Sequence, residues 1–387
     1  MASIDIPRPA FFDDEEFGIF ADSVGRFFDE HATPAAMARW REAGVVDRSI
    51  WEAAGAAGML GVSIPTRYGG AGGDFRHELV MMEEGGKRGV EGFALNLHNT
   101  IIAPYILESG TEEQRQRWLP GICSGEFITA IAMTEPDAGS DLQGIKTQAR
   151  RDGDDFVISG QKTYISNGQL ANLIVVACKT DPDRGAAGIS LIVVETDKVT
   201  GFQRGRNLDK IGRDSQDTSE LFFDAVRVPA ENVIGGEPNR GFFQMMEKLP
   251  QERLVLALGG MTVIERAIRL TTEYVRERKA FGRPIFDFQN TQFKLAEAKA
   301  EASVCKVFLN WCVEQLLAGK LDTTTASIAK LVVTEAECRI VDDCLQLHGG
   351  FGYMNESAIA RMYKDSRIQR IHGGTSEIMK LVIARTL

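Results

Sequence analysis

The chain has 387 residues, of which 44% are hydrophobic, and a formal net charge of −10 at pH 7. This negative charge opposes broad attraction to nucleic acid or anionic lipid, so we expect no nucleic-acid partner. No run of about eighteen apolar residues occurs, which predicts no membrane insertion. Residues 1–20 are acidic and are typical of neither a signal nor a transit peptide.

The cysteines and histidines predict a reducing compartment and no metal site. No two cysteines form a C-x-x-C pair, and most lie in apolar periodic segments, as buried reduced thiols do. A cytoplasmic location is therefore expected. The five histidines are scattered, with no pair at metal-ligand spacing.

Three segments with different periodicity follow one another along the chain. From residue 11 to about residue 121 apolar residues recur at spacings of three and four, which predicts helices and an all-α domain over 1–125. Short β-branched runs then follow at 156–158, 173–176, 189–194 and 221–228, which predict a β-domain over 126–236.

Long helices are expected again in the last segment, 237–387. One amphipathic helix is predicted over 323–347, where a single apolar stripe carries these residues: Ala329, Val332, Ala336, Ile340, Cys344 and Leu347. Gly349 and Gly350 are expected to end it. The predicted fold class is thus α+β, in three parts that close on a helical bundle.

The most informative motif follows the apolar run 127–133 and reads Thr134-Glu135-Pro136-Asp137-Ala138-Gly139-Ser140-Asp141. Glycine allows a ligand to approach the backbone closely, and the hydroxyls can donate to anionic oxygens. The motif resembles the T-E-P-x-A-G-S-D loop of the acyl-CoA dehydrogenase family. The resemblance implies an N-terminal all-α domain, a middle β-barrel or sandwich, a C-terminal four-helix bundle, and FAD as cofactor.

The resemblance also implies the flavin contacts. Nothing in the sequence indicates a Rossmann or P-loop site instead. In the β-domain the implied contacts are Ile131, Met133, Thr134, Gly139 and Ser140, followed by Tyr164, Ile165 and Ser166, where an aromatic ring and a hydroxyl face the flavin. Asp137 replaces a common glycine, and it would be strained if the turn required positive φ.

Further flavin contacts come from the C-terminal segment. The resemblance implies that Arg278, Phe281 and Gln289, together with Gln346, Leu347, Gly349 and Gly350, bind the flavin of a neighbouring subunit. A guanidinium suits pyrophosphate because it presents a planar pair of donors. Thr375, Ser376 and Glu377 open the last helix, whose N-terminus favours anionic groups. A homo-oligomer, expected to be a tetramer, follows from these contacts.

The catalytic base is the point where the sequence departs from the common family pattern. Many members carry a glutamate before the final Gly-Thr, whereas this chain has Gly373. The resemblance to branches with the segment L-x-x-E-R-L makes Glu252 the candidate base, and the backbone N–H of Gly373 the candidate donor to the substrate carbonyl. The alternative is that Glu252 lies in an ordinary solvated first helical turn after Pro250.

The expected reaction is the α,β-dehydrogenation of an acyl-CoA to the trans-2-enoyl-CoA, with electrons passed to an electron-transfer flavoprotein. The segment around Glu252 most resembles the long-chain branch, which implies a medium- or long-chain substrate. Its tail is expected to end near Asn96, His98, Ile102 and Phe243. Further substrate contacts are expected from these residues: Ser140, Pro250, Gln251, Arg253, Gly373 and Gly374.

Two other functions remain open from the sequence. One is a flavin oxidase or monooxygenase of the same fold, which would use molecular oxygen. The other is a binding protein that has kept the fold and lost turnover.

Overall fold

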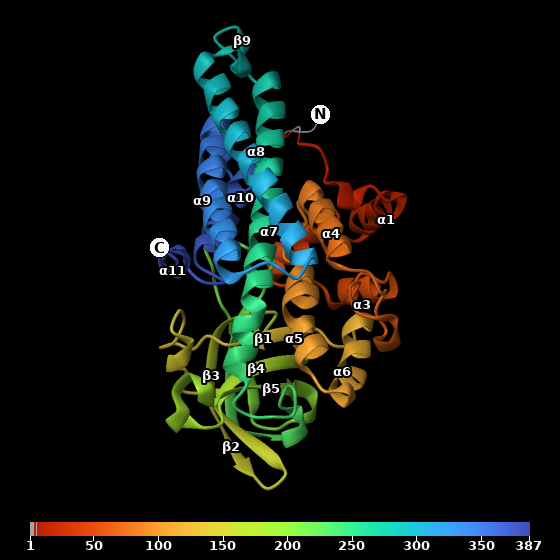
Figure 1. Cartoon of the computed structure of the whole chain (residues 1–387). Coiled ribbons are helices and arrows are strands. Elements are labelled where there is room, and N and C mark those ends of the chain that lie inside the picture. Colours follow the sequence, from red (N-terminus) through yellow and green to blue (C-terminus); the bar gives the residue numbers. More distant parts are fainter. Residues whose placement is uncertain (1–3, 5) are drawn as a thin grey trace.

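The structure is a computed structural model that describes residue 4 and residues 6–387. The N-terminal helices and a bundle of long helices lie side by side, and a curved sheet lies at one end of both (Figure 1). Helix α7 runs from the sheet to the far tip of the bundle, so it connects the two ends of the molecule.

The first body consists of short amphipathic helices, as the spacing of apolar residues predicted. They are α1 (Glu15–His31), α2 (Pro34–Ala43), α3 (Arg48–Ala56), α4 (Phe75–Arg88), α5 (Ala103–Ser109) and α6 (Glu112–Ser124). Capping boxes at Asp74 and Thr111 begin α4 and α6, where each cap side chain accepts from a backbone N–H that the helix leaves unpaired. A π-helical segment, Leu97–Ile102, leads directly into α5.

The middle part is one curved sheet of seven strands. The strands are β1 (Thr129–Ala132), β2 (Gln148–Asp152), β3 (Asp155–Ser166), β4 (Leu173–Lys179), β5 (Ile189–Glu195), β6 (Phe202–Asn207) and β7 (Thr218–Pro229). They pair in the order β1-β4-β2-β3-β7-β6, with β5 joined to β4. All four segments that the sequence predicted as strands are confirmed.

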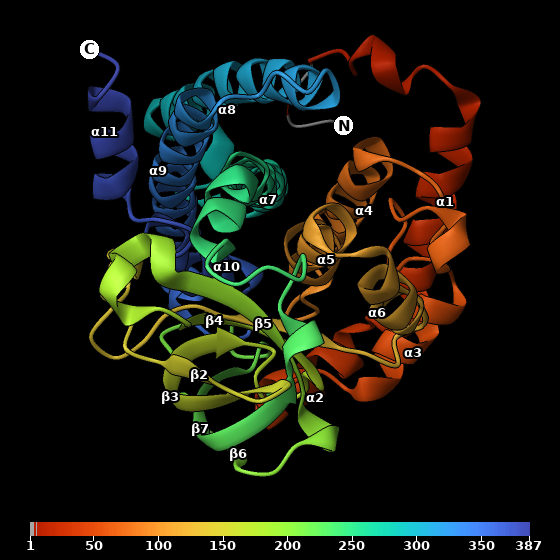
Figure 2. The same cartoon turned by 60° about the horizontal axis from the view of Figure 1, so that its bottom comes forward.

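The strands β4 and β5 are almost completely buried because both faces of the sheet are covered there. One face packs against α5, α6 and the start of α7, and the other encloses the interior of the curled sheet (Figure 2). This explains why these two strands read as continuous apolar runs rather than alternating ones.

The last part is the helical bundle. It contains α7 (Gly241–Glu277), α8 (Gln289–Leu317), α9 (Thr323–His348), α10 (Ala358–Ser366) and α11 (Ser376–Ala384), with a small hairpin of β8 (Lys279–Ala280) and β9 (Arg283–Pro284) at the tip. The helix predicted over 323–347 is confirmed as α9.

The predicted stripe of α9 needs one correction. Val332 is 40% exposed, whereas Val333 is fully buried and takes the core position between Ala329 and Ala336. Spacings of three and four both fit a helix of 3.6 residues per turn, so the sequence alone left the choice between the two valines open.

We propose domain boundaries at 125/126 and 236/237, in the connections that follow α6 and precede α7. In the described part of the chain, no helix is long and apolar enough to cross a membrane.

Candidate active site

Glu252 lies within α7, not at its beginning. The helix starts at Gly241 and continues through Pro250, so the first-turn alternative is wrong. A proline inside a helix removes one hydrogen bond, but the nine helical residues before it are held by packing against the sheet and α5. The carboxylate therefore projects from the middle of a rigid element.

The Glu252 side chain is half-buried, and its carboxyl group accepts a hydrogen bond from a tyrosine hydroxyl. Tyr105, which is fully buried on α5, donates its hydroxyl to Glu252 Oε1 at 2.8 Å. Burial raises the pKa of Glu252 to about 7, although the Tyr105 hydrogen bond and the charges of Arg253 and Lys248 oppose the rise. A carboxylate with a pKa near neutrality is suited to general-base catalysis.

The neighbours of Glu252 fix the helix around it. Gln251 donates its amide to the Thr100 carbonyl oxygen at 2.8 Å, and Arg253 donates to Ser327 Oγ at 3.0 Å from a buried position. Both side chains are therefore committed to neighbouring helices. Their contacts orient Glu252, while the predicted substrate contacts of Pro250, Gln251 and Arg253 stay predictions.

Gly373 lies against the same face of α7. It has φ +63°, and a Cβ added there would lie 2.2 Å from Leu256 Cδ1, one helical turn after Glu252. A glutamate at position 373 would thus need both a left-handed backbone and a displaced leucine. In the described part of the chain no hydrogen bond uses the Gly373 N–H, so it is available to a ligand.

A buried lysine holds the segment that contains Gly373. Lys330 on α9 is fully buried and donates to the Gly374 carbonyl oxygen at 2.7 Å. Burial lowers the pKa of Lys330 to about 8. The sequence analysis missed Lys330, although a lysine inside an apolar helical stripe was a usable signal.

The loop after β1 is held by hydrogen bonds on its buried side and is exposed on its other side. Glu135 is buried and accepts hydrogen bonds from Lys162 Nζ at 2.8 Å and from the Thr147 N–H at 3.0 Å. A Cβ added at Gly139 would touch nothing, and Ser140 is exposed. Asp137 has no positive φ and pairs with Lys146, so the strain considered for this turn is absent.

An irregularity in β3 presents the predicted flavin-facing aromatic residue. The pairing of β3 with β7 shifts register between Lys162 and Ile165, and Tyr164 adopts φ +61° at this bulge. Tyr164 is consequently 68% exposed, while Ile165 is buried. Bulges of this kind direct side chains toward binding sites.

The loop that joins β6 to β7 connects the end of β3 to helix α10. Asn167, next to Ser166, donates its N–H to the Asp217 carbonyl oxygen at 3.3 Å. Four residues earlier the Arg213 N–H donates to Asp365, and Lys364 pairs with Asp214 at 2.9 Å. These contacts join the end of β3 to α10, which precedes Gly373.

Thr375, Ser376 and Glu377 have roles within the chain itself. Thr375 caps α11 by accepting from the Ile378 N–H, and Ser376 donates to Glu335 at 2.7 Å. Glu377 is exposed at the start of α11. Their predicted contacts with the cofactor remain predictions.

The remaining predicted flavin residues form a second group at the tip of the bundle. Arg278 and Phe281 lie beside the β8–β9 hairpin, Gln289 begins α8, and Gln346, Leu347, Gly349 and Gly350 end α9. Tyr274 stacks on His348 at 4.3 Å and thereby joins the ends of α7 and α9.

This second group does not meet the first within one chain. Arg278 lies twenty-six positions after Glu252, directly after the last residue of α7, which corresponds to about 39 Å along the helix. Phe281 is 96% exposed and also has a positive φ of 49°. The predicted flavin contacts of the tip residues therefore lie far from Glu252 within one chain and stay predictions.

Comparison with known proteins agrees with this arrangement. Sequence profiles of the acyl-CoA dehydrogenase N-terminal, middle and C-terminal domains match residues 14–126, 130–226 and 239–387. The mitochondrial long-chain specific acyl-CoA dehydrogenase of Sus scrofa is 44% identical over 374 residues, covering 96% of this chain and 86% of that protein. The chain belongs to the acyl-CoA dehydrogenase family.

Two solved structures share the fold. An acyl-CoA dehydrogenase from Geobacillus kaustophilus is 46% identical with a TM-score of 0.94, covering 96% of this chain and 98% of that one. A glutaryl-CoA dehydrogenase from Mycobacterium smegmatis, in complex with FADH2, is 27% identical with a TM-score of 0.90, covering 100% and 97%. The predicted family, fold and enzyme class are confirmed.

The family binds FAD, which confirms the predicted cofactor. The donors of this chain fit it, because Ser140 and Tyr164 are exposed around the open space beside Gly139, and the guanidinium of Arg278 is exposed at the tip. The exposed groups at the sheet and at the tip are thus chemically suited to an aromatic ring and to phosphate, while their contacts with FAD stay predictions.

The residues expected around the acyl tail differ in burial. His98 and Ile102 are completely buried, and the two His98 nitrogens lie within hydrogen-bond distance of Ile122 O and Thr129 Oγ1. Neither lines the cavity that Asn96 lines. Phe243 lies nine residues before Glu252, at the sheet end of α7. The predicted contacts of these residues with the acyl tail stay predictions.

The sequence did not predict a role for Tyr105 in the site. It is 147 residues from Glu252 in sequence, and nothing local distinguishes it from other aromatic core residues. Only the packing of α5 against α7 makes it a partner of the candidate base.

Proposed function

We propose that this acyl-CoA dehydrogenase removes hydrogen from Cα and Cβ of a medium- or long-chain acyl-CoA and produces the trans-2-enoyl-CoA. The observation that carries the proposal is the half-buried Glu252 carboxyl group, which accepts a hydrogen bond from Tyr105 and lies one helical turn before Leu256, the residue that packs against Gly373. The acid that many family members have at the Gly373 position is absent, and Glu252 is available to replace it.

Glu252 takes the α-proton. With a pKa of about 7 the carboxyl group is partly ionised at neutral pH and is basic enough to accept a proton from carbon. The Tyr105 hydroxyl holds Oε1, which leaves Oε2 for the substrate. The Gly373 N–H donates to the thioester carbonyl oxygen, where negative charge develops as the proton leaves. FAD, when bound, supplies the acceptor for the hydride that leaves Cβ.

The polar residues of the loop after β1 hold the cofactor and the CoA portion. We assign the flavin ring to Ile131, Met133, Thr134, Tyr164, Ile165 and Ser166, and the CoA portion to Ser140. The buried Glu135–Lys162 pair supports this surface from the side facing away from the ligand. A rigid support of this kind limits the reorganisation that binding would otherwise require.

Arg278, Phe281 and Gln289 contact the cofactor of another subunit. The distance along α7 supports this assignment, because the tip residues are too far from Tyr164 and Gly373 to share one flavin within a chain. The active enzyme is therefore at least a dimer, and we propose a tetramer. A substitution such as Arg278→Met should then release flavin, with a smaller effect on the unfolding of the apoprotein.

The first experiment measures the visible spectrum of the purified protein and then adds acyl-CoAs of graded length without oxygen. A bound flavin absorbance that is bleached by medium- or long-chain thioesters supports the proposal. A flavin that no thioester bleaches would contradict it and would favour a protein that binds without turnover. We propose an electron-transfer flavoprotein as the acceptor, and rapid peroxide release in air would instead indicate an oxidase.

Sedimentation measures the subunit assembly. A monomer that retains flavin would contradict the assignment of Arg278 to a neighbouring site. The cytoplasmic location stays a prediction, which fractionation of the source cell would test.

A further inference from the structure

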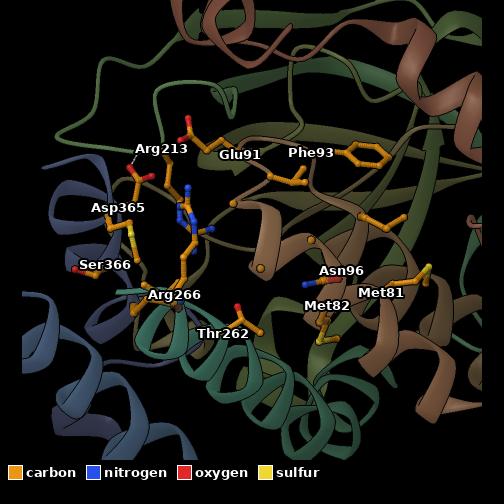
Figure 3. A pocket seen from close by; sticks show the side chains of 18 of the residues that line it. Met81, Met82, Glu91, Phe93, Asn96, Arg213, Thr262, Arg266, Asp365 and Ser366 are labelled. Carbon is orange, nitrogen blue, oxygen red and sulfur yellow. Dashed lines mark hydrogen bonds between the residues drawn. The ribbon is translucent and has the colours of Figure 1, made fainter. Parts of the chain in front are cut away.

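A cavity of about 190 Å³ lies beside α7, beyond the site described above (Figure 3). It is bounded by α4, the connection from α4 to α5, α7, α9 and α10. Its two sides differ: Met81, Met82 and Phe93 lie on one side, and Arg213, Arg266 and Asp365 lie on the other. The cavity thus has an apolar side and a charged side.

Two buried polar side chains in the cavity wall have atoms without partners. Glu337 is 1% exposed and Gln369 is 3% exposed. Glu337 Oε2 and Gln369 Oε1 make no hydrogen bond in the described part of the chain. A Cβ added at Gly260 would lie 2.7 Å from Glu337 Oε2, so this glycine makes the room that the carboxyl group occupies. Unpaired buried polar atoms are costly, and a ligand would satisfy them.

The guanidinium groups of the charged side carry no ion pair, although Arg213 donates to Gln216 Oε1 at 3.3 Å. In the part of the chain that the structure describes, neither Arg213 nor Arg266 has a carboxylate within ion-pair distance. Glu91 also lines the cavity but pairs with Arg41 at 2.6 Å and with Arg361 at 3.1 Å.

Asp365 is the remaining charged side chain of the cavity. It accepts from the Arg213 backbone N–H. Burial raises the pKa of Glu337 to about 8, so this carboxyl group is mostly protonated at pH 7 and can donate a hydrogen bond. The charged side thus contains two arginines without an ion pair, the Asp365 carboxyl group, and Glu337 as a neutral donor.

The cavity lies on the same stripe of α7 as Glu252. The positions 252, 256, 259, 263 and 266 are spaced by four and three and so share one helical face. Val263 and Arg266 line the cavity, and at Gly259, between Glu252 and the cavity, an added Cβ would touch nothing, so there is free space at this position. Val263 is about 16 Å and Arg266 about 21 Å from Glu252 along the helix, the length of an extended alkyl chain of roughly twelve to sixteen carbons.

We propose that this cavity binds a carboxylate at the far end of the acyl chain, so that the preferred substrate is a long ω-carboxyacyl-CoA. This inference rests on the proposed function, because it takes the α-carbon to lie at Glu252. Arg266 and Arg213 hold the terminal carboxylate, and the protonated Glu337 donates to it. The apolar side of the cavity covers the last methylenes.

The physical basis is the penalty for leaving buried polar groups unpaired. A methyl-ended chain of the same length would bring no acceptor to Arg266 or Glu337 and would displace water from both. A site built to bind a polar group discriminates strongly against an analogue that lacks it. A terminal carboxylate also neutralises the excess positive charge.

The test compares the holoenzyme with pairs of CoA thioesters of equal length, one with a methyl end and one with an ω-carboxylate. We expect kcat/KM to favour the ω-carboxylate at least tenfold at twelve to sixteen carbons. Glutaryl-CoA, which is too short to reach Arg266, should gain nothing from its carboxylate. An ω-hydroxyacyl-CoA tests whether charge is needed, and a preference for it over the ω-carboxylate would overturn the proposal.

Variants then test whether the cavity causes the preference for the ω-carboxylate. Arg266→Met should lower the ratio of the two kcat/KM values at least tenfold, whereas Arg269→Met, on the same helix but paired with Glu273, should leave the ratio unchanged. Binding of dodecanedioyl-CoA to a Glu252→Gln variant, measured by calorimetry, should weaken when Arg266→Met is added.

The possible outcomes distinguish a failure of this inference from a failure of the proposed function. If methyl-ended chains bleach the flavin and ω-carboxylate chains do not, the cavity assignment is wrong and the dehydrogenase stands. If Arg266→Met lowers kcat/KM equally for the methyl-ended and the ω-carboxylate thioesters, the arginine is structural and the inference is also wrong. If no thioester bleaches the flavin, the proposed function itself fails.

Discussion

Two carboxyl groups at α7 have different surroundings, and Glu252 is half-buried whereas Glu337 is 1% exposed. Glu252 accepts a hydrogen bond from the Tyr105 hydroxyl at 2.8 Å and lies one helical turn before Leu256, which packs against Gly373. Glu337 approaches α7 from α9 at Gly260, and its Oε2 has no partner in the described part of the chain. Burial raises the pKa of both, to about 7 and about 8.

The comparison shows that a raised pKa does not by itself identify a catalytic base. Both carboxyl groups are kept basic by the same cause, removal from water. What separates them is geometry: Glu252 is hydrogen-bonded to Tyr105 one helical turn before Leu256, which packs against Gly373, whereas Glu337 is in a cavity with two arginines. The first arrangement suits proton removal, and the second suits binding. The following predictions test this division, from the largest expected effect to the smallest.

Glu252→Gln should have the largest effect. The amide cannot accept a proton from carbon, so we expect flavin reduction by acyl-CoA to slow by about 10³-fold. Anaerobic stopped-flow absorbance measures this rate. Glu247→Gln, an exposed change on the same helix, is the control and should reduce flavin at the normal rate. A Glu252→Gln enzyme that keeps its reduction rate would falsify the assignment of the base.

Glu337→Gln should change how stability depends on pH. The folded protein holds the Glu337 proton more tightly than the unfolded chain, because the folded pKa is about 8 against an ordinary value of 4.5. Stability should thus fall as pH rises from about 4.5 through 8, by a few kcal/mol for this one group. The variant should lose that part of the slope.

Denaturant unfolding at several pH values from 5 to 8.5 measures this slope. Glu356→Gln, in the exposed segment before α10, is the control. Because an amide in the same place still lacks a partner, the slope and not the absolute stability is decisive. An unchanged slope would mean that Glu337 is ionised or hydrated in the folded protein.

Tyr105→Phe should shift the pH dependence of catalysis. The lost hydrogen bond stabilised the ionised form of Glu252, so its pKa should rise above 7 by about one unit. Flavin reduction, which needs the ionised form, should therefore be slower at pH 7 and recover at higher pH. A loss of activity that is equal at all pH values would indicate that Tyr105 only supports packing.

Gly260→Ala should have the smallest effect. Alanine favours the helix by up to about 1 kcal/mol, but the new Cβ would lie 2.7 Å from Glu337 Oε2. We expect a net destabilisation in the native background and a stabilisation when Glu337→Ala is also present. A double-mutant cycle should give a coupling of about 1–2 kcal/mol, and additive effects would contradict the contact.

The sequence by itself determined the features that depend only on residues close together in the chain. Short β-branched runs predicted β3, β4, β5 and β7, and the 3.6-residue period predicted α9, because these patterns follow from local backbone geometry. The loop 134–141 and the Glu252 segment could likewise be recognised from short ordered motifs. The choice of Val332 over Val333 failed because both fit the period.

Tertiary structure alone decided which distant groups meet. The Tyr105–Glu252 hydrogen bond, the Lys330–Gly374 contact and the cavity at Glu337 each join segments far apart in the chain. The continuation of α7 through Pro250 was also decided by packing, which outweighed the local preference of proline to end a helix. Such contacts depend on how helices pack, and packing is set by many side chains together, so no single motif contains it.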